Sequence, residues 1–156
     1  MFWKRFAPRL LPTQAAPLAP KLSPEELNRL LAEIFPQIGI GQGLEVEETG
    51  PGFSRLRMRY GEHLLRPGGT ISGPAMFALA DVSMYAAVLA SVGPVPLAVT
   101  TNLNINFLRK PGPSDMIGEA QLLKLGKRLA VGEIAIYTDG QDDLAAHATS
   151  TYSLPG

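Results

Sequence analysis

The sequence predicts an α+β fold in which an antiparallel sheet wraps around one long, apolar central helix. Residues 75–90 are apolar around nearly the whole circumference of a helix, and such a helix is normally buried on all sides. The strand-like segments that follow are joined by short turns, which favours an antiparallel sheet. Helical segments do not alternate with these later strands, so a doubly wound parallel fold is disfavoured.

The composition limits the class of protein. The chain has 156 residues, enough for one core, and its 14 basic and 14 acidic residues give a formal net charge of zero. No global charge therefore favours nucleic acid or a membrane surface as a partner. Cysteine is absent and only two histidines occur, so disulfides are excluded and a metal site is disfavoured. The chain start lacks the apolar core of a signal peptide, and we expect a cytoplasmic protein.

The chain divides into a Pro- and Ala-rich arm over residues 1–22 and one domain over 23–156. Ser23 and Glu26 form a capping box at the start of a helix predicted over 23–35. A hairpin follows, and the alternating arginines of its second strand are expected to face water. The apolar segment 75–90 is shorter than the about 20 residues that span a membrane. Strands are predicted over 44–48, 53–60, 97–108, 116–125, 130–137 and 144–154.

The strand over 97–108 carries an unusual polar face. Strict alternation places the odd-numbered residues from Val99 to Phe107 on one face and the even-numbered residues from Thr100 to Leu108 on the other. The second face holds three asparagines, a residue type that is depleted in strands. A solvated face and a polar wall or subunit contact explain this pattern about equally well.

One carboxylate interrupts the apolar central segment. Ser72 has the sequence position of a helix N-cap, and Pro74 occupies an early helical position where its missing N–H does no harm. Asp81 then lies near the middle of the helix, where a buried carboxylate is costly unless it is paired, hydrogen-bonded or lines a cavity. Asp81 is either a hydrogen-bonded carboxylate of the core or a functional group.

The run from Ser72 to Asp81 resembles the motif of the hotdog-fold acyl-CoA thioesterases, of the phenylacetate-pathway (PaaI-like) and 4-hydroxybenzoyl-CoA types. Those proteins place a His-Gly-Gly run before an Asp or Glu of the central helix. Residues 104–109 and the Gly126-Lys127 turn also look like theirs. The resemblance covers roughly residues 44–154 and implies the hotdog fold, with thioester hydrolysis as the activity.

The resemblance implies roles for Gly73 and Asp81. The backbone N–H of Gly73, at the helix N-terminus, would bind the thioester oxygen as negative charge develops there. Asp81 would act as a general base toward water or as a nucleophile. Eight residues of helix span about 12 Å, so one thioester does not reach both groups of the same chain. Catalysis therefore implies a homodimer with a shared site, which in this fold sometimes assembles further into a tetramer.

The sequence departs from the family pattern around these two residues. Ser72 stands where the motif has histidine, and Arg66 stands where relatives often have Asn or Gln. Tyr85 stands where some relatives have threonine, and Thr100 matches a strand hydroxyl that positions water in some of them. We assign Ser72 and Thr100 to the catalytic group with Asp81 and Gly73, and Arg66, Tyr85 and Asn104 to substrate binding. An Arg66–Asp81 ion pair is the structural alternative.

Basic residues near strand ends are candidates for coenzyme A phosphates. Arg109, Lys127 and Arg128 lie on the side that contacts these phosphates in the resembled family, and basic side chains suit phosphate recognition. Ordinary surface charge explains each of them singly at least as well. No metal or cofactor is expected, because coenzyme A is part of the substrate.

Three functions compete on this fold. The first is an acyl-CoA thioesterase, and the second is a non-catalytic protein that binds acyl-CoA or another acyl ligand. The altered motif residues Ser72 and Arg66 motivate the second. The third is a hydratase or dehydratase, which ranks last because those enzymes usually place a histidine with the acid.

Overall fold

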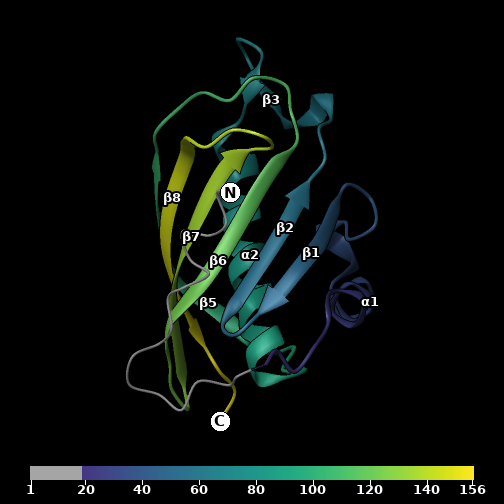
Figure 1. The fold of residues 1–156 in the computed structure, drawn as a ribbon, viewed down its shortest axis with the longest axis vertical. Coiled ribbons are helices and arrows are strands. Elements are labelled where there is room, and N and C mark those ends of the chain that lie inside the picture. Colours follow the sequence, from purple (N-terminus) through teal and green to yellow (C-terminus); the bar gives the residue numbers. More distant parts are fainter. Residues whose placement is uncertain (1–18) are drawn as a thin grey trace.

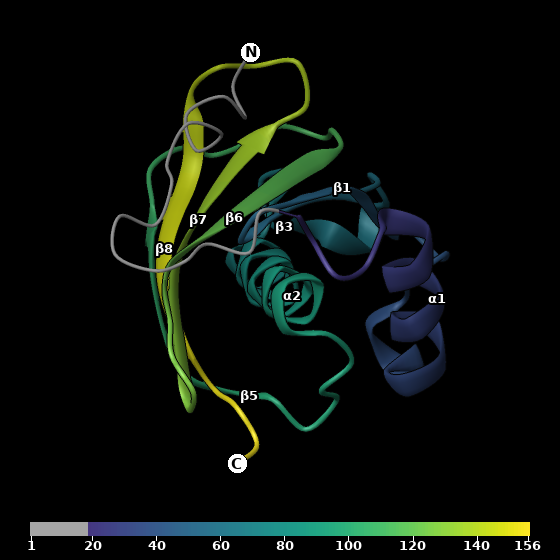
Figure 2. The ribbon, with the colours of Figure 1, turned by 60° about the horizontal axis from the view of Figure 1, so that its bottom comes forward.

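A computed structural model describes residues 19–156 of the chain. Its six-stranded sheet has the strand order β1-β2-β6-β7-β8-β5, and every neighbouring pair in it is antiparallel. The sheet curves around helix α2, and helix α1 lies beside β1 at one edge (Figures 1 and 2). This arrangement confirms the predicted sheet wrapped around one central helix. The predicted arm over 1–22 lies almost entirely outside the described residues.

The order of the elements also matches the prediction. The helices are α1, Pro24–Ile34, and α2, Gly73–Val92. A short hairpin just before α2, formed by the two-residue strands β3 and β4, was not predicted from the sequence. The strands are β1 Leu44–Gly50, β2 Phe53–Met58, β3 Leu65–Arg66, β4 Thr70–Ile71, β5 Val99–Phe107, β6 Met116–Leu125, β7 Leu129–Thr138 and β8 Leu144–Ser153.

Helix α1 forms as its N-terminal signal predicts. The Ser23 side chain accepts a hydrogen bond from the Glu26 N–H, and the Glu26 carboxylate accepts one from the Ser23 N–H. Asn28 then ties the helix to the edge strand β1, because its side-chain amide exchanges two hydrogen bonds of 2.8 and 2.9 Å with the backbone of Val46. The helix is therefore a fixed wall that also covers a sheet edge.

Helix α2 is longer than its apolar run suggested. It has 20 residues, starts at the predicted N-cap Ser72 and ends at Gly93. Our exclusion of a membrane span by length was therefore wrong, because α2 is long and apolar enough to cross one. Its side chains are instead mostly buried inside the sheet, as expected for a core helix.

Strand β5 corrects the predicted alternation. A β-bulge between Thr100 and Asn102 adds one residue to the strand relative to β8. Thr100 therefore faces the helix, as do Leu103 and Ile105, which pack against the core. The three asparagines face the other way and are exposed, and β5 is the edge strand opposite β1.

The arginines of β2 do not simply face water. The side chains of Arg55 and Arg57 are only 17% and 15% exposed and are held in an ion-pair network on the outer face of the sheet. Arg57 contacts Glu47 at 2.7 Å and Asp139 at 2.7 Å. Alternation identified their face correctly, but acidic partners on neighbouring strands cover them.

Candidate active site

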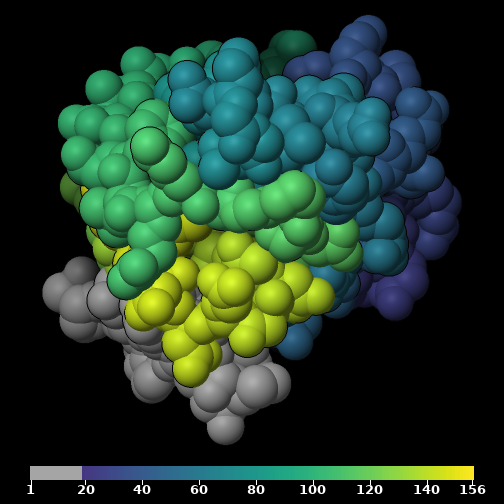
Figure 3. All heavy atoms as spheres, turned by 90° about the horizontal axis from the view of Figure 1, so that it is seen from above, coloured from purple at the N-terminus to yellow at the C-terminus, as the bar shows by residue number. Residues whose placement is uncertain are grey.

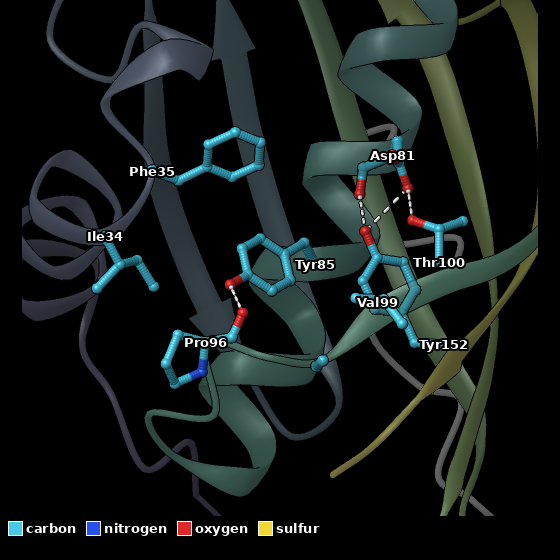
Figure 4. A pocket seen from close by; sticks show the side chains of 9 residues that line it. Ile34, Phe35, Asp81, Tyr85, Pro96, Val99, Thr100 and Tyr152 are labelled. Atoms are coloured by element: carbon cyan, nitrogen blue, oxygen red, sulfur yellow. Dashed lines mark hydrogen bonds between the residues drawn. The ribbon is translucent and has the colours of Figure 1, made fainter.

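An open stripe runs along α2 beside strand β5. Phe77 and Ala78 are exposed and Asp81 is partly exposed, whereas the rest of the helix from Leu79 onward is almost entirely buried. A cavity of about 340 Å³ opens beside Asp81. Its lining is Ile34, Phe35, Asp81, Tyr85, Pro96, Ala98, Val99, Thr100 and Tyr152 (Figure 4). The carboxylate thus lies at one side of a mostly apolar pocket whose opposite wall comes from the end of α1.

Two hydroxyl groups hold the Asp81 carboxylate. Thr100 Oγ1 donates a hydrogen bond of 2.7 Å to Asp81 Oδ1, and Tyr152 Oη lies 2.8 Å from the same oxygen (Figure 4). Within residues 19–156, Oδ2 accepts no hydrogen bond. One carboxylate oxygen is therefore fixed by the protein, and the other is available to water or a ligand. The Arg66–Asp81 ion pair that we considered is not formed.

Two stacked tyrosines form the floor of the pocket. The rings of Tyr85 and Tyr152 are 5.8 Å apart and 20° from parallel, and Phe35 meets Tyr85 edge-on. The Tyr85 hydroxyl donates to the Pro96 carbonyl at 2.9 Å and so turns away from Asp81. Burial raises the pKa of Tyr85, and burial together with the charge of Asp81 raises the pKa of Tyr152. Both phenols therefore remain protonated donors.

The first turn of α2 leaves one backbone N–H without a partner among the described residues. The Ser72 side chain caps the helix by accepting from the Ala75 N–H at 3.2 Å, so it is engaged in the backbone. Gly73 is the first helical residue, and its N–H makes no hydrogen bond in the part of the chain that the structure describes. A side chain at Gly73 would meet the Phe107 ring at 3.4 Å, which gives this glycine a packing role as well.

The residues predicted to bind substrate do not all lie at the Asp81 pocket. Tyr85 lines the Asp81 pocket, but Arg66 lies exposed on β3 and Asn104 points to the outer face of β5. Arg109 follows β5 at the end of the molecule where α2 begins, 3.6 Å from Asp143. Figure 3 shows that end, with the loop after β5 between the β3–β4 hairpin and the β7–β8 turn.

Lys127 and Arg128 lie at the opposite end of the sheet from Arg109. They form the β6–β7 turn, and the Arg128 carbonyl accepts from the Leu154 N–H just beyond β8. This end also holds Thr100 and Tyr152, which pair across β5 and β8. In one chain the predicted phosphate-binding residues therefore do not form one group, and their role remains a prediction.

Sequence reasoning missed Tyr152 and the wall supplied by α1. Tyr152 follows a run of small side chains on β8, Ala146, Ala148 and Ser150, which face the helix at every second position. A tyrosine at the end of such a run marks a gap large enough for a ring. That was the available signal, but nothing in it pointed to Asp81, which lies 71 positions earlier.

The comparisons with known proteins concern the family and the fold of the chain. The model of the thioesterase superfamily matches residues 68–145, which include α2, β5 and both Gly73 and Asp81. A protein of Saccharolobus solfataricus that is provisionally named an esterase is 40% identical over 86% of this chain and 87% of its own length. The chain belongs to the thioesterase superfamily. This confirms the resemblance seen in the sequence.

Solved structures confirm the hotdog fold of this superfamily member. A protein of Silicibacter sp. TM1040, provisionally named a thioesterase, superimposes with a TM-score of 0.81 at 45% identity, covering 89% of this chain and 96% of that one. The PaaI protein from the phenylacetic acid degradation operon of E. coli superimposes with a TM-score of 0.71 at 21% identity, over 86% of this chain and 97% of that one. The second likeness concerns the fold alone.

Proposed function

We propose that the protein is a cytoplasmic acyl-CoA thioesterase whose reacting carboxylate is Asp81. The observation that carries this proposal is the position of Asp81 at the side of an apolar pocket, with Oδ1 held by two hydroxyl groups and Oδ2 unoccupied by the described residues. An acyl group suits the apolar wall of the pocket, and the thioester carbon then lies beside the carboxylate. No metal or cofactor is required for this chemistry.

The proposed reaction adds water to the thioester carbonyl. Asp81 Oδ2 takes one proton from a water molecule while the oxygen of that water bonds to the carbonyl carbon. The carbonyl oxygen becomes an oxyanion. The intermediate then breaks its carbon–sulfur bond and releases the coenzyme A thiolate, which takes up the proton. In the alternative route Asp81 attacks the carbon itself, and the carbon–sulfur bond breaks to release the coenzyme A thiolate and leave a mixed anhydride. Water then hydrolyses the anhydride to the free acid and restores the Asp81 carboxylate. Both routes need a donor for the oxyanion.

A second copy of the chain supplies that donor in the proposed dimer. Thr100 lies beside Asp81 near one end of β5, and Phe107 lies beside Gly73 at the other end. If two β5 edges pair antiparallel about their centre, the Thr100 end of β5 in one copy lies opposite the Phe107 end of β5 in the partner subunit. The partner's Gly73 N–H then approaches Asp81 of this chain. The exposed edge of β5 and the exposed stripe on α2 support this assembly.

The same pairing gathers the cations that are separated in one chain. Lys127 and Arg128 lie at the Thr100 end of the sheet, whereas Arg109 lies at the Phe107 end. Antiparallel pairing brings the partner's Arg109 to the end that holds Lys127, Arg128 and Asp81. Three cationic side chains would then flank one site, as the phosphates of coenzyme A require.

The test is thiol release from short-, medium- and long-chain and aryl acyl-CoA esters. We expect the wild type to hydrolyse at least one ester and the Asp81→Asn variant to lose about 100- to 10,000-fold in rate, because a general base contributes that much. Asp139→Asn is the matched control, since it makes the same chemical change on the outer face of the sheet, in contact with Arg57. Acyl-CoA binding without any thiol release would instead identify a non-catalytic binding protein.

A further inference from the structure

The hydroxyl of Tyr152 reaches Asp81 because of strand pairing. Tyr152 on β8 lies directly opposite Thr100 on β5. Tyr152 faces α2 by the regular alternation of β8, and the bulge after Thr100 turns the Thr100 side chain to the same face. Their hydroxyl oxygens consequently meet one acceptor, Asp81 Oδ1, at 2.8 and 2.7 Å (Figure 4). Two hydroxyl groups at one oxygen restrict the rotation of a carboxylate more than one of them alone would.

Tyr152 is itself held rigidly. Its side chain is only 4% exposed, and its ring stacks on Tyr85, whose hydroxyl is in turn tied to the Pro96 carbonyl. Tyr152 therefore has one position from which its hydroxyl can donate, either to Asp81 Oδ1 or to the Asp81 carbonyl at 3.2 Å. A rigid donor on a rigid strand is an effective way to orient a reacting group.

Tyr152 is not suited to transfer the proton itself. Burial and the neighbouring Asp81 charge raise the pKa of its phenol, so the hydroxyl remains protonated and is a weak acid toward a leaving thiolate. Tyr152 bonds to Oδ1, whereas Oδ2 is the carboxylate oxygen that accepts no hydrogen bond from the described residues. Its contribution is therefore made through Asp81.

We propose that Tyr152 is a positioning residue that holds Asp81 Oδ1 so that Oδ2 points at the reacting water or thioester carbon. The position of Tyr152 beside Asp81 follows from the pairing of β5 with β8 and from the distances of the Thr100 and Tyr152 hydroxyl oxygens to Asp81 Oδ1. Its effect on rate rests on the proposed function, whether Asp81 serves as base or as nucleophile.

The test compares Tyr152→Phe with Tyr85→Phe. Each substitution removes one hydroxyl from the same ring stack, but only the Tyr152 hydroxyl bonds to Asp81. We expect Tyr152→Phe to lower kcat about 10-fold or more with KM within about twofold, the range of a hydrogen bond to a charged group. Tyr85→Phe should leave the Asp81 carboxylate in its wild-type orientation, because the Tyr85 hydroxyl bonds to the Pro96 carbonyl instead.

A crystal structure of Tyr152→Phe provides a second readout that does not depend on turnover. We expect the Asp81 carboxylate to be rotated or present in two orientations. A Tyr152→Phe variant with wild-type kcat and an unrotated Asp81 carboxylate would overturn the proposal. The Asp81→Asn variant would still decide whether the protein is a thioesterase. If the wild type hydrolyses no ester, the proposed function fails, and the orientation of Asp81 still decides the role of Tyr152.

Discussion

Thr100 Oγ1 lies 2.7 Å from Asp81 Oδ1, although strict alternation along the strand places Thr100 among the outward-facing asparagines. The bulge between Thr100 and Asn102 produces this contact by shifting the register of β5 against β8 by one residue. Bulges are common next to active sites, where they redirect a side chain. Because of this shift, Thr100 on the edge strand β5 bonds to Asp81, the one carboxylate of helix α2.

Removal of the Thr100 hydroxyl should weaken the reaction without unfolding the chain. Thr100→Val keeps the shape of the side chain, and we expect kcat to fall about 10-fold because a hydrogen bond to a charged group is lost. Thr100→Ser retains the hydroxyl and should recover most of the rate. Steady-state kinetics on the best acyl-CoA ester measure this. Equal rates for the valine and serine variants would show that the hydroxyl is not used.

Phe77 offers a test of the subunit interface. It is 42% exposed on the open stripe of α2, and Leu123 is 41% exposed on β6. Light scattering should give the wild type a mass twice the 16.7 kDa of one chain, or four times for a tetramer. Phe77→Asp should yield a folded monomer without activity, because it places a charge in the proposed interface. Leu123→Asp is the matched control and should remain assembled. An assembled Phe77→Asp variant would place the interface elsewhere.

Gly118 is a packing position between the sheet and α2. A methyl group there would clash with Ser83 Oγ and would lie 3.0 Å from Leu79 Cγ, both on the buried face of the helix. We expect Gly118→Ala to lower the free energy of unfolding by about 1–3 kcal/mol, the usual cost of overpacking. Gly112→Ala, where a methyl group meets nothing within 4 Å, should be nearly neutral. Urea unfolding measures both, and equal stabilities would show that α2 shifts to accept the methyl group.

The outer ion pairs predict a pH dependence of stability. A hydrogen bond from Arg57 lowers the pKa of Asp139 in the folded chain. This carboxylate therefore stabilises the fold fully when the pH is above its pKa in the unfolded chain. The effect is lost as the pH falls through the lowered pKa of the folded chain. Asp139→Asn should cost less than about 1 kcal/mol at pH 7, because the side chain is 45% exposed. The unfolding free energies of variant and wild type should converge in acid and in 1 M salt. A difference that persists at low pH would mean that Asp139 acts through packing.

The fold could be predicted from the sequence because the signals for its helices and strands are local. The capping box of α1, the apolar circumference of α2 and the short turns between later strands each fix one element without long-range information. Asp81 stood out for the same reason, as one charge in an apolar helix. The structure added what depends on register: the bulge that turns Thr100, and the strand pairing that brings Tyr152 to a residue 71 positions away. Alternation identifies a face, but not the partners across it, as the covered Arg57 also shows.

In the proposed dimer, each active site takes Asp81 from one subunit and the Gly73 N–H from the other. Gly73→Pro removes this N–H. The first position of a helix tolerates proline, and the preceding residue Ser72 has the extended backbone that a following proline favours. Gly73→Ala keeps the N–H and is the control. Gly73→Pro and Asp81→Asn chains should each be inactive alone, whereas Gly73→Ala should remain active.

Mixing the two inactive chains under subunit exchange tests directly whether one site is built from two subunits. Half of the dimers are then mixed, and each mixed dimer has one site with both groups intact, so we expect thiol release to recover to roughly a quarter of the wild-type rate. A mixture that stays inactive although mixed dimers form would contradict the shared site.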